Sequence, residues 1–319
     1  MELSVLVTGG AGFIGSHLVD KLVDMGLAVR VVDNLSSGRM DNVRHHAGQI
    51  EVLNADLKIP HVTFEAVKGV EAVFHFAANP EVRVSTTNPE VHFGENIVAT
   101  FNLLEAMRKA DVGQLVFASS SSVYGEPEDI PVDESAPIRP VSVYGASKAA
   151  CENLIHAYTR LYGIGAVALR YANVVGPRLR HGVIYDFIVK LLRQPEELEI
   201  LGDGTQTRSY IHIGDAVDAT ITAWKSLRGG FEAYNVGSMD WVNVNQIAQI
   251  VTSAMGLDGV RFTYKPVLHG VGWPGDVKRI ALTIERLKSL GWKPKLNSEQ
   301  ALREAAKSIL EELRSPADA

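Results

Sequence analysis

Short apolar runs rich in β-branched residues alternate with longer segments of helical periodicity over roughly the first half of the chain. The apolar runs occupy residues 4–9, 28–33, 50–56, 72–78, 114–120 and 165–171, and the helical segments occupy 16–26, 95–110 and 143–163. Strands that alternate with helices indicate a parallel sheet with helices on both faces. Burial of both faces also explains why these strands are almost continuously apolar. We therefore expect an α/β fold with a doubly wound parallel sheet.

The alternation becomes irregular after residue 171, where glycine-rich and arginine-containing loops separate scattered helices. Such a change of pattern indicates a second, differently built part of the chain. We expect a Rossmann domain over residues 1–171 and a smaller carboxyl-terminal lobe, mainly for substrate, over residues 172–319. Part of the segment 205–236 is expected to return to the Rossmann domain.

Composition narrows the classes of partner. The 319 residues include 31 lysines and arginines against 37 aspartates and glutamates, which gives a net charge of −6. Neither nucleic acid nor an anionic membrane is favoured by that balance, and no run reaches the length of a membrane span. Cys151 is the single cysteine, so it has no intrachain disulfide partner, and no signal-peptide pattern precedes the first glycines. We expect a cytoplasmic protein that acts on a small molecule.

A glycine-rich turn joins the first strand to the first helix. Gly10, Gly12 and Gly15 form a G-x-G-x-x-G pattern, which Gly9 extends to G-x-x-G-x-x-G. Glycines at these spacings allow a tight turn, close approach of the backbone to a pyrophosphate, and free N–H groups at the helix start. The alternative is a glycine-rich turn without a ligand. The surrounding strand and helix, and an aspartate after the second strand, favour dinucleotide binding.

That aspartate is Asp33, at the end of the second strand. A carboxylate there accepts hydrogen bonds from ribose hydroxyls and repels a 2′-phosphate, so we expect NAD as the cofactor in preference to NADP. The alternative is a solvated carboxylate at a strand end. Asp56, which ends the third strand, is a candidate for the adenine, although a turn-forming aspartate explains it nearly as well.

Tyr144 and Lys148 stand four residues apart at the start of a predicted helix and share one face of it. Free tyrosine has a pKa near 10, and a nearby positive charge favours the ionised phenol. The serine run at 119–122 ends a predicted strand on the same sheet edge as the glycine turn, which brings Ser120 within reach of Tyr144. The alternative is a helix-start aromatic, a solvated lysine and a flexible serine loop.

Several motifs in this order resemble the extended short-chain dehydrogenase/reductase family, and within it the nucleotide-sugar epimerases, most closely those acting on UDP-glucose at C4. The resemblance covers nearly the whole chain. It is carried by "TGGAGFIG" at the start, "DNLSSG" from Asp33, "HFAAN" from His75, "SSSSVYG", "YGASK", "RYANVVGP" from Arg170 and "GDGTQTRSYIHIGD" from Gly202.

The resemblance implies roles for particular residues. Ser120, Tyr144 and Lys148 would be catalytic, and the substrate would contact Ser120, Tyr144, Asn173, Arg208 and Asp276. NAD would contact Gly9, Gly12, Phe13, Ile14, Gly15, Asp33, Asn34, Ser37, Gly38, Asp56, Leu57, Ala77, Ala78, Asn96, Tyr144 and Lys148. The resemblance also implies a homodimer formed through helices near 96–108 and 146–161, although apolar faces there could equally belong to the core.

One departure concerns the carboxyl-terminal lobe. Related proteins often have Arg-x-Gly-Asp where this chain has Trp273-Pro274-Gly275-Asp276, so one expected arginine for the diphosphate is absent. Positive groups also concentrate at Arg178, Arg180, His181 and Arg208, for which a solvated basic loop is the alternative. These residues leave the nucleotide and the sugar undetermined.

Before "VYG" the related 4,6-dehydratases carry an Asp-Glu pair and the decarboxylases a glutamate, whereas this chain has Ser121 and Ser122. Serine is a poor proton carrier at neutral pH, so elimination is disfavoured. We expect an isomerase that epimerises UDP-glucose and UDP-galactose at C4 through a transient 4-keto sugar. The alternatives are another epimerase, a one-way dehydrogenase or reductase, or an NAD-sensing binding protein. The scattered histidines predict no metal site, with His45 and His46 at the surface.

Overall fold

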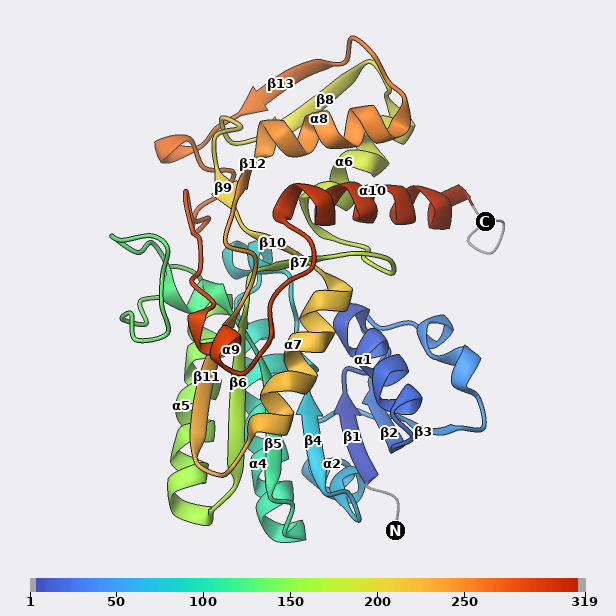
Figure 1. Cartoon of the computed structure of the whole chain (residues 1–319), viewed down its shortest axis with the longest axis vertical. Helices are drawn as coiled ribbons and strands as arrows, with labels where there is room; N and C mark the ends of the chain where they lie inside the picture. The colour runs from blue at the N-terminus through green and yellow to red at the C-terminus, as the bar shows by residue number, and fades with distance from the viewer. Residues whose placement is uncertain (1–3, 315–319) are drawn as a thin grey trace.

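The computed structural model describes residues 4–314 and centres on a sheet of seven parallel strands (Figure 1). The strand order across the sheet is β11-β6-β5-β4-β1-β2-β3. The strands are β1 (Ser4–Thr8), β2 (Ala28–Asp33), β3 (Ile50–Asn54), β4 (Ala72–His75), β5 (Gln114–Ser120), β6 (Gly165–Tyr171) and β11 (Phe231–Val236). The expected doubly wound α/β fold is confirmed, and six of these strands coincide closely with the apolar runs of the sequence.

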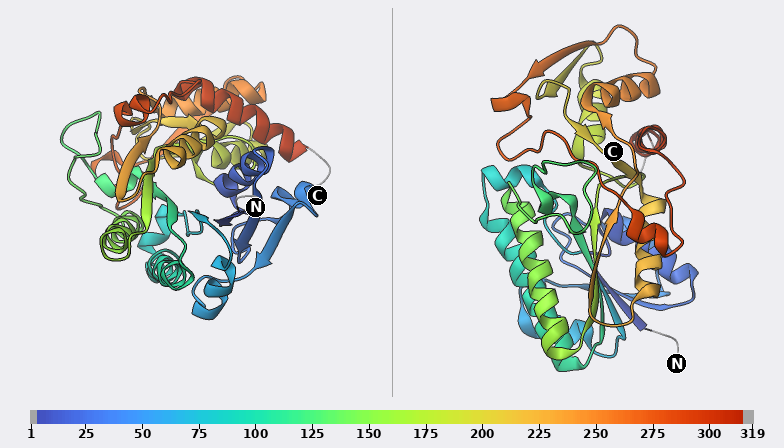
Figure 2. Two further views of the ribbon diagram at one scale, coloured as in Figure 1. Left: turned by 60° about the horizontal axis from the view of Figure 1, so that its bottom comes forward. Right: turned by 60° about the vertical axis from the view of Figure 1, so that its left-hand side comes forward.

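Helices cover both faces of this sheet, as Figure 2 shows in its right-hand view. One face packs against α1 (Phe13–Asp24), α7 (Ile213–Ser226) and α9 (Glu285–Ser289), and the other against α2 (Pro60–Val67), α4 (Ala99–Ala110) and α5 (Val143–Tyr162). Alternate residues of β1 enter the two cores, Val5 and Val7 on one side and Leu6 on the other. Burial on both sides is the physical reason for its unbroken apolar sequence.

A further core lies beyond the carboxyl edge of the sheet, in a second region of the molecule at the top of Figure 1. Its helices are α6 (Gly182–Arg193), α8 (Val244–Met255) and α10 (Ser298–Arg314). Its strands form three pairs: β7 (Asn173–Val175) with β10 (Tyr210–His212), β9 (Thr207–Arg208) with β12 (Val242–Asn243), and β8 (Glu197–Leu201) with β13 (Arg261–Lys265). Phe187, Ile247 and Ile309 are buried where these helices meet.

The chain enters this second region and returns. After β6 it forms α6 and β8, and it then comes back to the sheet through α7 and β11, which pairs with β6 as the edge strand. It leaves once more for α8 and β13, returns to the sheet at α9, and ends in α10. The two regions are therefore joined by several crossings of the chain, and the division at residue 171 stays a prediction.

Local sequence sets the limits of the helix that carries Tyr144. Ser142 caps α5 by accepting a hydrogen bond from the Gly145 N–H at 3.1 Å, and Gly163 ends the helix with φ of 73°. The helix expected over 95–110 begins instead as a π-helical segment, η4 (Phe93–Val98), before α4. The other short helices are η1 (Met40–Asn42), η2 (Arg44–His46), η3 (Val82–Thr86), α3 (Glu90–His92), η5 (Ser121–Tyr124) and η6 (Leu268–Gly270).

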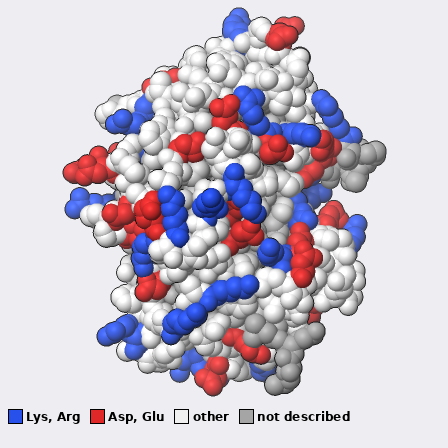
Figure 3. Space-filling model, in the orientation of Figure 1, with Lys and Arg blue, Asp and Glu red and all other residues white. Residues whose placement is uncertain are grey.

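Charged side chains of both signs are interspersed over the face drawn in Figure 3, and neither sign covers it continuously. This mixing agrees with the modest net charge of −6. Among residues 4–314, no helix combines the length and the apolar character needed to cross a membrane.

Candidate active site

A cavity of about 550 Å³ lies at the carboxyl edge of the sheet, between the sheet and the core that contains α6, α8 and α10. We call the wall formed by residues 9–15 and 33–39 the glycine end, and the wall formed by residues 81–83, 173–187, 206–210 and 273–280 the arginine end. Ser120, Tyr144 and Lys148 line the cavity as well. Ligands of doubly wound sheets bind outside the carboxyl ends of the strands, which is where this cavity lies.

Closely packed backbone shapes the turn over residues 9–15 of the glycine end. Gly9 has φ of 67°, and a Cβ there would lie 2.6 Å from the Ala77 nitrogen. A Cβ on Gly15 would lie 2.1 Å from the Gly9 oxygen. Gly12 precedes α1 without a side-chain cap, so the first N–H groups of the helix are free to bind an anion. These constraints fit the pyrophosphate of a dinucleotide.

Asp33 is buried beside this turn. Its carboxylate accepts hydrogen bonds from the Ala11 N–H at 3.0 Å and the Leu35 N–H at 2.8 Å. Burial raises the pKa of Asp33, while these N–H donors oppose the rise. A Cβ on Gly38 would lie 2.7 Å from either carboxylate oxygen, so glycine lets the loop close over Asp33. Asn34 reaches Asp56 at 3.4 Å, which brings the ends of β2 and β3 together.

Most residues predicted from the sequence line the cavity. They are Gly9, Gly12, Phe13, Ile14, Gly15, Asp33, Asn34, Ser37, Asp56, Leu57, Ala77, Ala78, Ser120, Tyr144, Lys148, Asn173, Arg208 and Asp276. Two predicted cofactor ligands, Gly38 and Asn96, are not part of its lining among the described residues. Gly38 lies behind Asp33, as its contact with that carboxylate requires.

Asn96 is buried behind the wall, and both ends of its amide are bound by the protein. Its oxygen accepts from the Asn79 N–H at 2.9 Å, and its nitrogen donates to Ser147 Oγ at 2.8 Å. Ser147 in turn donates to the Tyr144 carbonyl at 2.7 Å. Asn96 therefore positions the start of α5, and its contact with NAD stays a prediction.

Ser120, Tyr144 and Lys148 come together as the sequence predicts. Ser120 ends β5, where its hydroxyl donates to Ser122 Oγ at 3.1 Å and lies close enough to the Tyr144 phenol to affect its pKa. Lys148 is buried one turn further along α5, where Nζ donates to the Ala118 carbonyl at 2.8 Å and lies 5.9 Å from the Tyr144 ring centroid. This arrangement places a phenol, an alcohol and an ammonium on one side of the cavity.

Burial has the largest effect on the pKa values of Tyr144 and Lys148. It raises the pKa of Tyr144 to about 12, against the opposing effect of the Ser120 hydrogen bond, and it lowers the pKa of Lys148 to about 8. The sequence suggested that Lys148 lowers the pKa of Tyr144, but burial outweighs that effect among the protein's own groups. A phenolate here requires further positive charge, such as that of an oxidised nicotinamide.

His75 is a buried neutral histidine behind the same wall, and burial lowers its pKa to about 3. Thr100 donates its hydroxyl proton to the Asn96 carbonyl at 2.6 Å, so it can only accept from His75 Nε2, 2.9 Å away. His75 Nδ1 then accepts from the Thr8 hydroxyl at 2.7 Å. These bonds tie β1, β4 and α4 together beneath the cavity.

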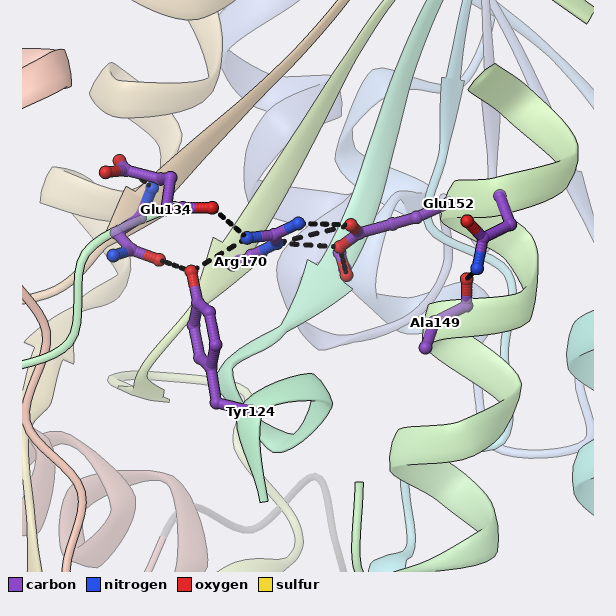
Figure 4. A network of polar contacts seen from close by, with 8 residues as sticks. Tyr124, Glu134, Ala149, Glu152 and Arg170 are labelled. Carbon is purple, nitrogen blue, oxygen red and sulfur yellow. Dashed lines mark hydrogen bonds and ion pairs between the residues drawn. The ribbon is translucent and has the colours of Figure 1, made fainter. Parts of the chain in front are cut away.

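A buried ion pair fixes α5 to the sheet, as Figure 4 shows. Arg170 of β6 donates to both oxygens of Glu152, at 3.1 Å from Nε and 2.7 Å from Nη2, and each side chain is about 5% exposed. Nη1 donates to the Tyr124 hydroxyl at 2.9 Å and the Glu134 carbonyl at 3.0 Å. Glu152 also accepts from Ser119, the neighbour of Ser120, so the pair positions the strand end and helix that carry the three candidate catalytic residues.

Arg208, which the resemblance assigns to the substrate, lines the cavity at the arginine end. Its Nη2 donates to Asp276 at 2.7 Å and to the Val277 carbonyl, and its Nη1 donates to the Thr207 carbonyl at 2.8 Å, so its contact with the substrate stays a prediction. Asp276 also accepts from the Gly272 N–H at 3.1 Å and is buried. Asn173 is exposed on the cavity wall.

Sequence reasoning missed a cluster on the opposite side of this end. Arg83 of η3 donates through Nε to Glu81 at 3.1 Å and reaches Asp186 of α6 at 3.5 Å. Its guanidinium carbon lies 5.8 Å from the Trp273 ring centroid. All four residues line the cavity. No local motif marks Arg83, because two of its partners, Asp186 and Trp273, are distant in the sequence.

His45 and His46 lie beside α1, outside the cavity lining. Both Nε2 atoms are 2.8 Å from the same oxygen of Asp20, whose other oxygen is 2.9 Å from Arg178. His45 is exposed, but His46 is buried, so the expectation of a surface position is wrong for His46. These contacts fasten the loop after β2 to α1, and the expectation of no metal stays a prediction.

Known proteins resemble this chain closely. Residues 5–237 match the model of the NAD dependent epimerase/dehydratase family. A putative UDP-glucose 4-epimerase of Methanocaldococcus jannaschii is 41% identical over 307 residues, which cover 94% of this chain and 96% of that protein.

Two solved structures share the fold over almost the whole length. A crystal structure of a UDP-galactose 4-epimerase has a TM-score of 0.88 and 51% identity, covering 98% of this chain and all of that one. A UDP-glucose 4-epimerase of Thermotoga maritima, solved with UDP-glucose, has a TM-score of 0.88, 34% identity and the same coverage. The fold, the glycine turn and these likenesses agree with the resemblance in the motifs, and the chain belongs to the NAD dependent epimerase/dehydratase family.

Proposed function

We propose that this protein interconverts UDP-glucose and UDP-galactose by NAD-dependent epimerisation at C4. One observation carries the proposal: Ser120, Tyr144 and Lys148 meet on a wall between the glycine end and the arginine end of a single cavity. That position lets one set of side chains face both a dinucleotide and a sugar nucleotide. The names of the relatives, UDP-glucose and UDP-galactose 4-epimerases, support the same reaction.

The glycine end fits NAD, because its glycines exclude any Cβ from the path of a pyrophosphate and Asp33 stands beside it to accept from a ribose. Gly9, Gly12, Gly15, Asp33, Asn34 and Asp56 would hold the cofactor. The chemistry that NAD supplies when bound is the reversible acceptance of a hydride.

The chain's own groups handle the proton. In the proposed reaction the Tyr144 oxygen takes the proton of the sugar 4-hydroxyl and later returns it, while Ser120 hydrogen-bonds the same sugar oxygen. Lys148, fixed by the Ala118 carbonyl, places an ammonium next to the phenol and favours its ionised form. Epimerisation needs no second proton-transfer group: the keto sugar would turn in the cavity and take the hydride back on its other face, while Tyr144 returns the proton.

The segment after Ser120 supports epimerisation over elimination. Ser121 and Ser122 occupy η5 on the cavity wall, and neither hydroxyl is a proton carrier near neutral pH. Removal of water from C5 and C6 would need an additional acid and base at this place.

The test is to incubate the purified protein with UDP-galactose and no added cofactor, and to separate the products by chromatography while recording absorbance of reduced nicotinamide. Appearance of UDP-glucose without net reduced cofactor is expected. Stoichiometric consumption of added NAD would instead identify a dehydrogenase. No conversion, with or without NAD, would overturn the proposal and favour another nucleotide sugar or an NAD-sensing binding protein.

We also propose that two copies pair through α4 and α5. Phe93, Phe101, Leu161 and Tyr162 are large apolar side chains exposed on or beside these helices, with Leu161 70% exposed. Apolar side chains gathered on one surface favour association. Light scattering after size exclusion should give a mass near twice that of the chain, and Leu161→Asp should give a monomer. A wild-type monomer would contradict this pairing.

Two smaller proposals concern organisation and location. We propose that residues 1–171 form the NAD-binding domain and residues 172–319 mainly the substrate lobe. The segment from α7 to β11 belongs to the first of these. Limited proteolysis should cut between the two parts.

We propose a cytoplasmic location, which is supported by a single buried cysteine, Cys151. Cell fractionation tests it.

A further inference from the structure

His92, the last residue of α3, is fully buried next to Tyr144 and is not part of the cavity lining among the described residues. Within residues 4–314, neither of its ring nitrogens has a hydrogen-bond partner. Burial and the nearby Lys148 ammonium lower the pKa of His92, so its ring is neutral near neutral pH and carries one N–H and one bare nitrogen. Unpaired polar groups inside a protein cost stability, so hydrogen bonding does not account for a histidine at this position.

The contact that His92 does make is with the group that carries the proton in the proposed reaction. Its ring packs edge-to-face with the Tyr144 ring, with 5.6 Å between the ring centroids and 66° between the planes. This is a preferred geometry for two aromatic rings, and it restricts the direction of each. Tyr144 lines the cavity, so His92 supports it from the side of the protein interior.

The segment that carries His92 also holds the backbone at the start of α5. It continues into the π-helical turn η4, and both α3 and η4 contact α5. From η4, Asn96 donates to Ser147, while the Tyr144 N–H donates to Ser85 Oγ at 3.1 Å. π-helical turns are frequent at functional sites. The backbone of Tyr144 is therefore fixed by hydrogen bonds, and the His92 ring restrains its side chain.

We propose that His92 is a positioning residue: its ring fixes the direction of the Tyr144 phenol in the cavity, and its nitrogens take no part in proton transfer. The inference rests on the proposed function, since it takes Tyr144 as the group that accepts the sugar proton. Reaction rates depend steeply on the placement of the reacting atoms, and a displacement of about 1 Å lowers a rate about 100-fold.

The test measures kcat and KM for UDP-galactose with the NAD-containing protein. His92→Ala should lower kcat about 10- to 100-fold and leave KM nearly unchanged, because the phenol loses its support and no substrate contact is removed. His92→Phe keeps a flat ring and should retain the kcat and the pH profile of wild type. His156→Ala is the matched control: it removes an exposed histidine of α5 that lies 5.4 Å from the Phe231 ring, and kcat should not change.

A second readout does not depend on activity. With an NMR-active carbon isotope in the tyrosine rings, the Tyr144 signal is identified by its absence in Tyr144→Phe. It should be single and sharp in wild type and His92→Phe, and broadened or split in His92→Ala, where the phenol takes several orientations. If thermal unfolding shows that His92→Ala does not fold, His92→Leu replaces it with the same expected results, because leucine fills the space without a flat ring.

Two results would overturn the inference. One is an unchanged kcat in His92→Ala. The other is a loss of kcat in His92→Phe as large as in His92→Ala, which would show that the nitrogens act in the reaction. Wild type that leaves UDP-galactose unconverted, while its Tyr144 signal responds to His92→Ala as expected, would uphold the positioning role and overturn the proposed function.

Discussion

The two ends of the cavity are built in different ways. In the glycine end, the turn over residues 9–15 is made by closely packed backbone, and a Cβ on Gly9 or Gly15 would collide with other backbone atoms. The arginine end is made by side chains from four separate segments, and the carboxylates of Asp186 and Asp276 contact its Arg83 and Arg208. A turn of closely packed backbone tolerates almost no substitution, whereas the side chains of a wall can be exchanged while the backbone keeps its place. Binding of a shared cofactor suits the first construction, and variation in substrate suits the second.

The largest expected effect is on kcat, and it comes from Tyr144, which lies between the glycine end and the arginine end. Tyr144→Phe should lower kcat by about 10³- to 10⁴-fold, because it removes the proton-transfer group and keeps the ring that packs 5.6 Å from His92. Bound NAD and UDP affinity should not change. Tyr264→Phe, at an exposed tyrosine of β13, is the control. Unchanged kcat in Tyr144→Phe would remove the link between the two ends and revive a binding function.

The buried ion pair between Arg170 and Glu152 lies behind the cavity wall, and breaking it tests how much it contributes to the stability of both ends of the cavity. Glu152→Gln should lower the free energy of unfolding by about 3–5 kcal/mol, because Arg170 would keep a buried charge without its partner. Glu299→Gln breaks an exposed pair with Arg303 and should cost about 0.5 kcal/mol or less. Urea unfolding measures both. Equal, small losses would show that Arg170 finds other partners when Glu152 is neutral.

A pair of glycine substitutions tests the backbone character of the glycine end. Gly9→Ala should cost about 3 kcal/mol, combining a positive φ with overlap against Ala77, and should abolish retention of NAD. Gly163→Ala shares the positive φ but has no atom within 4 Å of the added Cβ, so it should cost about 1 kcal/mol. Denaturant midpoints and the cofactor content of the purified protein are the measurements. Normal NAD content in Gly9→Ala would contradict this description.

The smallest effect is a pH dependence. Burial lowers the pKa of Lys148 to about 8, so the lysine is charged below that pH, and kcat/KM should fall by about tenfold per pH unit above it. The free energy of unfolding should instead rise with pH. The unfolded lysine keeps its proton up to about pH 10.5, so folding releases a proton between about pH 8 and 10.5 and stability rises there. A kcat/KM that stays flat to pH 10 would exclude a role for the ammonium.

The sequence predicts the fold and the glycine end well because their signals are local. Apolar runs and glycine spacings lie within a few residues of what they determine, and Tyr144 and Lys148 share one helix face. Pairings across the chain leave no such signal. Nothing in the sequence joins Arg83 to Trp273 or Glu152 to Arg170, and the burial of His46 depends on Asp20 of α1. Asn96 and Gly38 were placed by resemblance, and the structure shows each supporting a neighbour behind the wall.

The chain leaves the sheet between β6 and β11, so these two neighbouring strands are synthesised at different times. Strands β1 to β5, with the glycine turn, are complete once Ser120 has been synthesised, but the edge of β6 is covered only by β11, which ends at Val236. At translation rates of about 5–20 residues per second, the ribosome needs several seconds to make the intervening segment. An uncovered parallel strand is a site for wrong pairing. The edge of β6 therefore stays open to wrong pairing while the second region is being made.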